Sequence, residues 1–403
     1  VKDTGERGAA NDAANWNAYL ENAQEAIDII LDYCKENNAF GPKDSPSYGN
    51  TDIWAIFTAA RCGYIPYDDD TYFDRWFANT KIYLQNKKDE GTDLSQWQAT
   101  ELSKLILAIE SIGYDPRDIS SVNLLDAVGK RNGSNYLNTQ YAIHAIKSGN
   151  YTASTFSEKE MEKWVHEKAT DLLNAKDSTF TNADNTMNYQ PLVYWYGKEG
   201  FGDVTEAIKR ALKKFPEIAQ RSTGSFCTVG HDTECGSFGN NAWNDAQAMI
   251  FAGIFNVNVL DYGSGYTKNG NNIIDAFFDL VNLKDRTIHG FTNYDVPQIA
   301  RGLNAFVRQR KGQSNFWDFS DVTVPTKSVN DMILALNDNS TKEEIEAARN
   351  AYNALDEKHK AIFNKDTLRK LLAAENGKGD SITKVIAAID ALPAADKLTL
   401  EDK

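Results

Sequence analysis

The sequence of 403 residues has no apolar run of the roughly 20 residues that a membrane-spanning helix requires, so no membrane span is expected in this fragment. It also lacks a basic patch, because 43 Lys and Arg stand against 57 Asp and Glu and give a formal net charge of −14. Binding to a phosphate backbone requires clustered positive charge. We therefore expect no nucleic acid partner.

Histidine and cysteine are scarce. The five histidines form no HxxxH or HExxH pair, so we expect no metal and no cofactor. Of the four cysteines, Cys34 and Cys62 lie on helical runs and are predicted to be free buried thiols. Cys227 and Cys235 share the loop SFCTVGHDTECGSFG and are candidates for a disulfide that would brace it. A metal site that also uses His231 is the alternative.

The material for a packed core is present, since 41% of the residues are hydrophobic and 11% are aromatic. A polar stretch with Asn, Thr or Asp, followed by an apolar run with helical spacing, occurs six times. The copies are NTDIWAIFTAARCGY from Asn50, ATELSKLILAIESIGYDP from Ala99, NTQYAIHAIKSGNY from Asn138, NTMNYQPLVYWYG from Asn185, NDAQAMIFAGIFNV from Asn244 and TNYDVPQIARGLNAF from Thr292. Their spacing of about 40 to 60 residues leaves room for two antiparallel helices per unit, which is typical of a repeat architecture.

Amphipathic segments alternate with the six copies. They cover roughly residues 15–36, 70–86, 122–129, 157–174, 203–220 and 269–283. Their apolar residues recur every three or four positions, which predicts outer helices with one solvated face. The six copies are apolar around more of their circumference, as at Ile53, Ile56 and Phe57, and are predicted to be inner helices. Six helices of each kind predict an all-α fold, an (α/α)6 toroid over residues 15–321, after a flexible N-terminus at residues 1–14.

The composition changes near residue 321. VTVPTKS predicts a linker at residues 322–327, and residues 328–403 are rich in Ala, Leu, Glu and Lys, which predicts a small helical bundle. Ser340-Thr341 followed by Glu343 and Glu344 is a helix-start signature. SITKVIAAIDAL from Ser381 repeats the pattern of SVNDMILALND from Ser328, so we expect a second, truncated module. Together with a start at Val1 without Met or a signal peptide, this indicates a fragment of a longer chain.

Three phrases carry a resemblance to a known family: TELSKLILAIESIGYDPRD, DNTMNYQPLVYWY and GSFGNNAWNDAQAMIFAGIFNVNVLD. Over residues 15–320 the chain resembles the terpenoid cyclase/prenyltransferase-like α/α toroids of secreted and surface proteins of Gram-positive bacteria. The part from Val324 resembles the small three-helix repeats that form stalks in cell-wall-attached proteins. The resemblance implies an extracellular location, either secreted or attached to the cell wall. It does not assign an activity, because members of this fold bind or convert unrelated molecules.

Carboxylates occur at the starts of the inner helices, at Asp52, Glu101, Asp184, Asp245 and Asp295. If these helix ends meet at one mouth, two of the carboxylates could act as the acid and base of a glycoside hydrolase or lyase. Glu101, Asp245 and Asp52 are the catalytic candidates. The alternative is that each acid caps its own helix, since acidic and hydroxyl residues favour helix N-termini.

Amide and aromatic side chains occupy the same positions. The ligand-binding candidates are Asn50, Asp52, Trp54, Trp97, Gln140, Tyr189, Gln190, Trp243, Asn244, Gln247 and Tyr294. Sugars stack on aromatic rings and present hydroxyls to amides and carboxylates, so this mixture favours a polar ligand over a hydrocarbon. The alternative is that the aromatic rings fill the space between inner helices while the amides cap them.

These patterns favour a monomeric surface or secreted protein that binds a carbohydrate or another polar small ligand at the mouth of the toroid, without catalysis. A host glycan or a cell-wall glycan is the expected partner. The second class is a carbohydrate-active enzyme with two carboxylates. The third is a structural or adhesion scaffold without a small ligand, which side chains filling the toroid axis would support.

Overall fold

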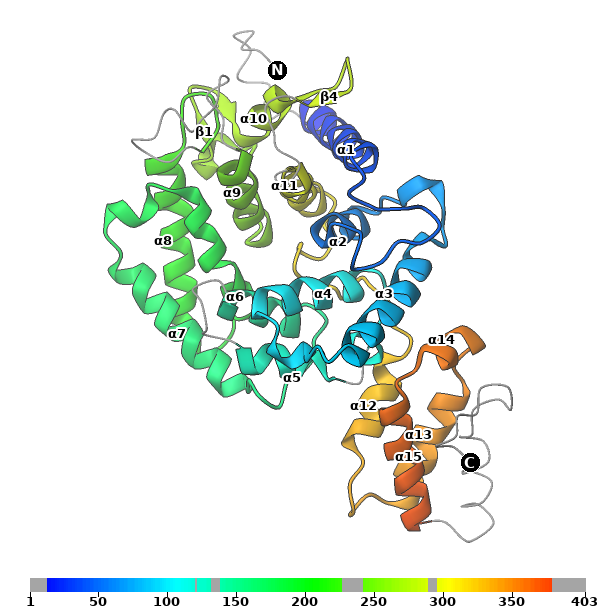
Figure 1. Ribbon diagram of the computed structural model, residues 1–403. Coiled ribbons are helices and arrows are strands. Elements are labelled where there is room, and N and C mark those ends of the chain that lie inside the picture. The colour runs from blue at the N-terminus through cyan, green and yellow to red at the C-terminus, as the bar shows by residue number, and fades with distance from the viewer. Residues whose placement is uncertain (1–12, 120–121, 132–137, 227–241, 289–295, 379–403) are drawn as a thin grey trace. The chain divides into compact units, whose positions relative to one another are not determined.

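The structure is a computed structural model in which residues 13–119, 122–131, 138–226, 242–288 and 296–378 are described. Helices dominate these residues, so the predicted all-α class is confirmed, and strands occur among them only in two short antiparallel pairs (Figure 1). The chain forms two compact units. Unit 1 contains the described residues of Val1–Ile112 and Leu124–Val322, and unit 2 contains those of Gly113–Asn123 and Thr323–Lys403. No helix in the described ranges is long and apolar enough to cross a bilayer.

The α-helices of unit 1 are α1 (Ala13–Glu36), α2 (Ile53–Cys62), α3 (Tyr72–Asp89), α4 (Ala99–Ser111), α5 (Leu124–Arg131), α6 (Asn138–Lys147), α7 (Glu158–Asn174), α8 (Gly202–Ala219), α9 (Ala242–Ile254), α10 (Ile273–Leu280) and α11 (Val296–Arg310). Its 3-10 turns are η2 (Pro66–Asp68), η3 (Leu94–Gln96), η5 (Asp177–Phe180), η6 (Ala183–Asn188), η7 (Gln190–Tyr194) and η9 (Tyr262–Ser264). Strand β1 (Thr267–Lys268) pairs with β2 (Asn271–Asn272), and β3 (Val281–Asn282) pairs with β4 (Thr287–Ile288). Unit 2 contains η4 (Pro116–Asp118), α12 (Lys327–Ala335), α13 (Lys342–Asn353), α14 (Glu357–Ile362) and α15 (Lys365–Lys378).

The six repeated runs of unit 1 contact one another in a closed order. Helix α2 contacts α4, α4 contacts α6, and α6 contacts η7. Both η6 and η7 contact α9, α9 contacts α11, and α11 returns to contact α2. Figure 1 shows α1, α3, α7 and α8 outside these segments. Consecutive repeats therefore lie side by side, and the last lies beside the first.

Helix α2 shows how the sequence sets the bounds of an inner helix. The Asp52 carboxylate accepts a hydrogen bond of 2.9 Å from the Trp54 amide, one of the N–H groups that a helix N-terminus leaves without a partner. Gly63 ends the helix with φ of 72°, a left-handed conformation that costs glycine little. Between these ends, Ile53, Ile56 and Phe57 are buried.

The fourth repeat departs from the helix that its sequence predicts. Residues 183–194 form the two 3-10 turns η6 and η7, with Pro191 near the start of η7. Proline has no amide hydrogen, and it disfavours the α conformation in the residue before it. The apolar spacing of this run correctly predicted that its residues are buried. The prediction of an α-helix was wrong, because the run forms 3-10 turns.

The segment after α11, residues 314–321, is held by two buried arginines. Arg61 donates 2.9 Å to the Asp321 carboxylate and 3.2 Å to the main-chain oxygen of Phe316. Arg308 also forms an ion pair with Asp321, and it donates 2.9 Å to the main-chain oxygen of Ser314. One carboxylate thus joins the last turn of α2 to the last turns of α11.

This anchoring places Trp317 among the inner helices. Its ring stacks on His144 of α6 at 4.0 Å and on Phe57 of α2 at 5.7 Å between centroids. The indole Nε1 donates 2.9 Å to Oε1 of Gln190 in η7. Trp317 is only 3% exposed and contacts three of the six inner segments, so it fills part of the space that they enclose.

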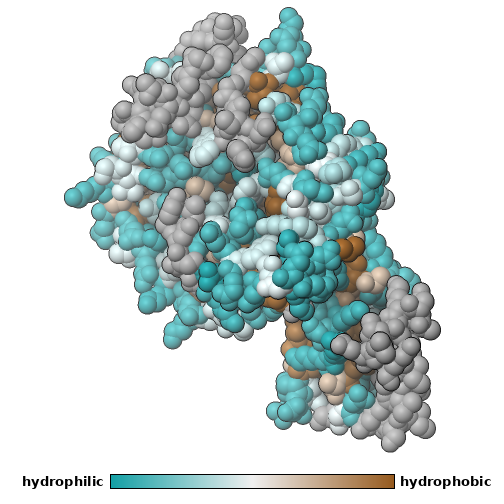
Figure 2. All heavy atoms as spheres, in the orientation of Figure 1, coloured by the Kyte–Doolittle hydropathy of each residue, from teal (hydrophilic) through white to brown (hydrophobic). Residues whose placement is uncertain are grey.

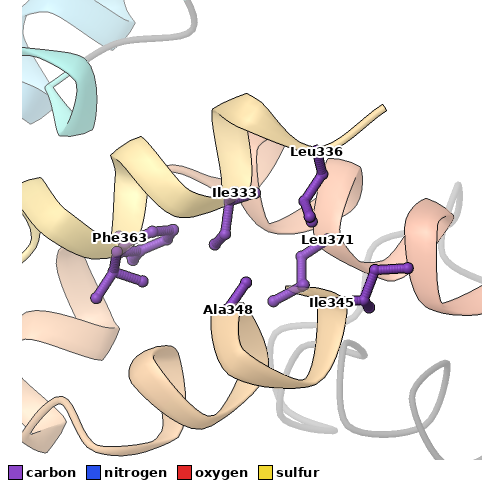
Figure 3. Close-up of a cluster of buried hydrophobic side chains, with 7 residues drawn as sticks. Ile333, Leu336, Ile345, Ala348, Phe363 and Leu371 are labelled. Atoms are coloured by element: carbon purple, nitrogen blue, oxygen red, sulfur yellow. The ribbon is translucent and has the colours of Figure 1, made fainter. Parts of the chain in front are cut away.

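Unit 2 has its own hydrophobic core. Figure 3 shows Ile333 and Leu336 of the α12 region, Ala348 of α13 and Leu371 of α15 pointing toward one another. Phe363, which follows α14, closes the same cluster. Apolar residues of this Ala-, Leu-, Glu- and Lys-rich part of the chain therefore pack together between its helices.

A buried ionic cluster joins residues 113–118 to α12 within unit 2. Arg117 donates 2.7 Å to Asp115 and 2.7 Å to Asp331 of α12. Asn330 donates 3.1 Å to each of the buried carboxylates of Asp115 and Asp118. Residues 113–123 lie between two helices of unit 1 in sequence, yet these bonds make them part of unit 2.

Candidate functional site

The described surface has no large apolar patch in the view of Figure 2, where hydrophilic residues predominate and hydrophobic ones appear in small groups. The exposed large hydrophobic side chains are Ile65, Ile82, Leu173, Trp243, Met332 and Leu334. Because these positions are scattered along the chain, the surface gives no indication of an extended apolar docking face. A cavity is a better place to look for function.

A cavity of about 620 Å³ lies in unit 1 beside the N-terminal ends of α2 and α4. Four residues that the sequence selects, Asn50, Asp52, Trp54 and Glu101, line it. The other lining residues are Tyr33, Cys34, Asn37, Asn38, Ala39, Tyr48, Gly49, Thr51, Ile53, Lys104 and Val296. The wall thus combines aromatic rings, amides and charges of both signs.

The loop before α2 is fixed by its own side chains. Asn50 Oδ1 accepts from the Ser47 amide at 2.8 Å, and its Nδ2 donates 3.0 Å to the Ser45 oxygen. Thr51 Oγ1 donates 2.8 Å to the Ser47 oxygen and accepts from Trp76 Nε1 at 3.0 Å. These short-range bonds hold the polar wall of the cavity in one conformation before any ligand arrives.

Tyr48 connects this loop to α4. Its hydroxyl donates 3.1 Å to the Glu101 carboxylate, and its ring stacks on Trp97 at 5.4 Å. Burial and the Glu101 charge raise the pKa of Tyr48 far above its usual value, so the hydroxyl stays a donor. Lys104 forms an ion pair with Glu101. Trp97 supports the cavity wall from behind Tyr48 and does not line the cavity itself.

Trp54 has a cation on its ring. Arg301 of α11 places its Cζ atom 4.5 Å from the centroid of the indole, and Tyr141 of α6 lies 5.7 Å away between centroids. Such contacts between a guanidinium and an indole are attractive, and more so when both groups are desolvated. Three inner helices therefore meet at Trp54.

The predicted amides on the other inner segments bind one another. Gln140 donates 3.1 Å to Asn188. Gln190 donates 2.8 Å to Gln247, which donates 2.9 Å to Gln298. Their hydrogen bonds run from Trp317 through η7 and α9 to α11. Gln140, Gln190 and Gln247 are buried and Gln298 is half-buried, so the bonds they form are those of a packed interior.

The remaining aromatic and amide candidates are placed differently from one another. Asn244 is buried and accepts a 2.7 Å hydrogen bond from the Asp184 amide. Tyr189 is buried between η6 and η7, and burial raises its pKa. Trp243 on the first turn of α9 is 47% exposed. None of the three lines the 620 Å³ cavity.

The acidic candidates also differ in their surroundings. Asp52 caps α2, and Glu101 pairs with Lys104 and Tyr48. Asp245 is fully buried, and its two carboxylate oxygens accept from Ser225 Oγ at 3.0 and 2.9 Å. Burial raises the pKa of Asp245 to about 8, so this carboxyl is protonated at neutral pH. Only Asp52 and Glu101 share the cavity.

Some candidates lie outside the described residues, namely Tyr294, Asp295, Cys227, Cys235 and His231. Cys34 and Cys62 are free thiols, as expected, but only Cys34 is buried, and Cys62 is half-buried. Within the described ranges, His, Cys, Asp and Glu form no group of three that could hold a metal ion.

Sequence reasoning missed Tyr48, Lys104 and Arg301. Tyr48 stands two residues before the first repeat, so its position was a usable signal. Lys104 and Arg301 lie on predicted inner helices, where a cation is unusual and invites a search for its partner. Comparisons of the chain with family models, with curated proteins and with solved structures gave no match.

Proposed function

We propose that the protein binds a polar, carbohydrate-like ligand in the cavity beside α2 and α4, without catalysis. The observation that carries this proposal is the composition of one cavity of about 620 Å³, in which Trp54 and Tyr48 stand next to Asn50, Asp52 and Glu101. A volume of this size suits a small ligand. Aromatic faces beside fixed hydrogen-bonding groups suit the two kinds of surface that a sugar ring presents.

We further propose that unit 1 is an (α/α)6 toroid. The closed order of contacts from α2 through α4, α6, η6–η7, α9 and α11 back to α2 supports it. In this scheme η6 and η7 replace the fourth inner helix. The resemblance of residues 15–320 to α/α toroids of Gram-positive surface proteins is the basis for proposing an extracellular, secreted or wall-attached protein. A cell-wall or host glycan would then be the partner of a monomer.

Binding is tested by titration calorimetry against a panel of glycans, with Trp54→Ala as the informative variant. We expect at least one glycan to bind and Trp54→Ala to lower its affinity about 10-fold, because aromatic anchors dominate small interfaces. Trp164→Ala is the matched control. Trp164 is also half-buried under a cation, Lys168, but it lies on α7, away from the cavity. Glu101→Ala is a second cavity variant that does not remove core packing.

Two results would contradict the binding proposal. One is a panel in which no glycan binds the wild-type protein. The other is binding that neither Trp54→Ala nor Glu101→Ala changes. The first result would favour the scaffold without a small ligand, which the filling of the inner space by Trp317 already supports.

A carbohydrate-active enzyme is the second candidate, favoured by one observation: Asp52 and Glu101 line the same cavity. Glycosidases use two carboxylates that face one substrate. On this hypothesis any glycan that binds is cleaved, either by hydrolysis or by elimination. Glu101→Gln then lowers the rate of cleavage at least 100-fold. Release of reducing ends measures hydrolysis, and absorbance of unsaturated products measures the lyase reaction. Binding without either product over a day of incubation would exclude the hypothesis for that glycan.

A further inference from the structure

Four arginines are buried among the described residues, and three of them have carboxylate partners. Arg61 and Arg308 share Asp321, and Arg117 binds Asp115 and Asp331. Arginine is almost never fully buried without such a partner, because removing its charge from water is costly. The fourth is Arg301, which is 5% exposed.

Arg301 has no anion in the described part of the chain. Its Nε atom is fully buried without a hydrogen bond, and the contact of its guanidinium is the Trp54 ring. The Asp52 carboxylate attracts the Arg301 charge electrostatically, but it accepts its hydrogen bond from the Trp54 amide, as the cap of α2. Burial lowers the pKa of Arg301, and guanidinium groups are so basic that the charge persists.

Within the described ranges, a second polar atom on the same side of α11 lacks a hydrogen-bond partner. Asn304 lies three residues after Arg301, and its Oδ1 is fully buried without a hydrogen bond. Residues three apart on a helix share a side, so a group that reached the guanidinium would also pass near this oxygen. Native proteins rarely leave such atoms unsatisfied, and each case needs an explanation.

We propose that Arg301 binds the carboxylate of an acidic sugar, with the sugar ring on the Trp54 side of the site. This inference rests on the proposed function, because Trp54 lines the 620 Å³ cavity and carries Arg301 on its ring. A planar guanidinium matches a carboxylate through two parallel hydrogen bonds. The missing counter-ion of Arg301 then belongs to the ligand, and Asn304 Oδ1 accepts from a ligand hydroxyl.

Three small ligands separate the parts of this proposal: glucuronate, glucose as the neutral sugar, and acetate as the carboxylate without a sugar. We expect glucuronate to bind at least 10-fold more tightly than either of the others in calorimetry. Arg301→Gln should lower the glucuronate affinity at least 10-fold and leave glucose unchanged. Arg301→Lys, which keeps the charge but not the planar fork, should fall between Arg301→Gln and the wild type.

Arg310→Gln is the matched control. Arg310 lies on the same helix and also stacks on a tryptophan, with its Cζ atom 4.3 Å from the Trp16 ring, but Trp16 does not line the cavity, whereas Trp54 does. It should leave glucuronate binding unchanged. Without ligand, Arg301→Met should lower the Tm less than Arg308→Met does, since it loses the contact with the Trp54 ring but breaks no ion pair among the described residues, whereas Arg308→Met breaks the pair with Asp321.

The outcomes distinguish this inference from the function on which it rests. Glucuronate binding that survives Arg301→Gln would overturn the inference, and Trp54-dependent binding of glucose would leave the proposed function standing. Equal binding of acetate and glucuronate that depends on Arg301 but not on Trp54 would overturn the acidic sugar and the carbohydrate function together. A Tm of ligand-free Arg301→Met that falls as far as that of Arg308→Met would also count against the inference, because losing the Trp54 contact alone should cost less than breaking an ion pair.

Discussion

Replacing Trp317 by alanine is expected to lower the free energy of unfolding by about 4 kcal/mol. Truncation of a buried tryptophan removes its transfer free energy and leaves a cavity, and such changes cost about 3–5 kcal/mol. Trp317 also stacks on His144 and Phe57, and its Nε1 satisfies Gln190. The substitution therefore removes contacts to three segments, α2, α6 and η7, at once. Urea denaturation followed by far-UV circular dichroism measures it.

Trp317→Phe is the control that separates the contribution of ring packing from that of the hydrogen bond. Phenylalanine keeps an aromatic ring between His144 and Phe57 but cannot donate to Gln190, so we expect a loss of about 1–3 kcal/mol. Glycan binding at the cavity should persist in this variant, because Trp317 does not line it. A loss below 1 kcal/mol for Trp317→Ala would contradict the position of this ring inside unit 1.

Local signals in the sequence were sufficient for the helices and for part of the cavity. Apolar spacing predicted most of the helices of unit 1, and the alternative that Asp52 caps its own helix is what α2 shows. Asn50, Asp52 and Trp54 are neighbours in sequence, so their common place at one cavity needs no long-range information. Glu101 joins them because its repeat follows theirs, and α2 contacts α4.

Long-range contacts account for what the sequence did not show. Gln190 and Gln247 are 57 residues apart, and their amides bond to each other. Helical spacing predicted that both lie at the starts of inner helices. It does not predict which side chains of different helices contact each other. The same limit applies to Asp115, whose hydrogen-bond partner Asn330 is 215 residues away.

The unpaired Arg301 could not be recognised from its own neighbourhood either. A cation on an apolar helix is visible in the sequence, but its burial and the absence of an ion-pair partner among the described residues are properties of the fold. Arg61 and Arg308 occupy similar apolar helices and have a carboxylate. Only the comparison among the buried arginines shows that Arg301 differs from the other three in having no ion pair with a described carboxylate.

The second large effect is expected at Asp245 and depends on pH. Burial raises its pKa from 3.8 in the unfolded chain to about 8 in the folded protein. Between these values the folded protein keeps a proton that the unfolded chain releases, so the free energy of unfolding falls as pH rises. The contribution is complete below about pH 4 and is lost as pH rises through 8, at about 1.4 kcal/mol per unit.

Asp245→Asn removes this titration, because an amide is neutral throughout the range. The free energy of unfolding of the variant minus that of the wild type should therefore increase by about 4 kcal/mol from pH 5 to pH 8. Urea denaturation at each pH measures it, with Asp171→Asn on the exposed side of α7 as the control that should show no such trend. A constant difference for Asp245→Asn would mean that the folded protein holds this carboxylate ionised. The bonds from the Phe226 amide and from Ser225 would then outweigh burial.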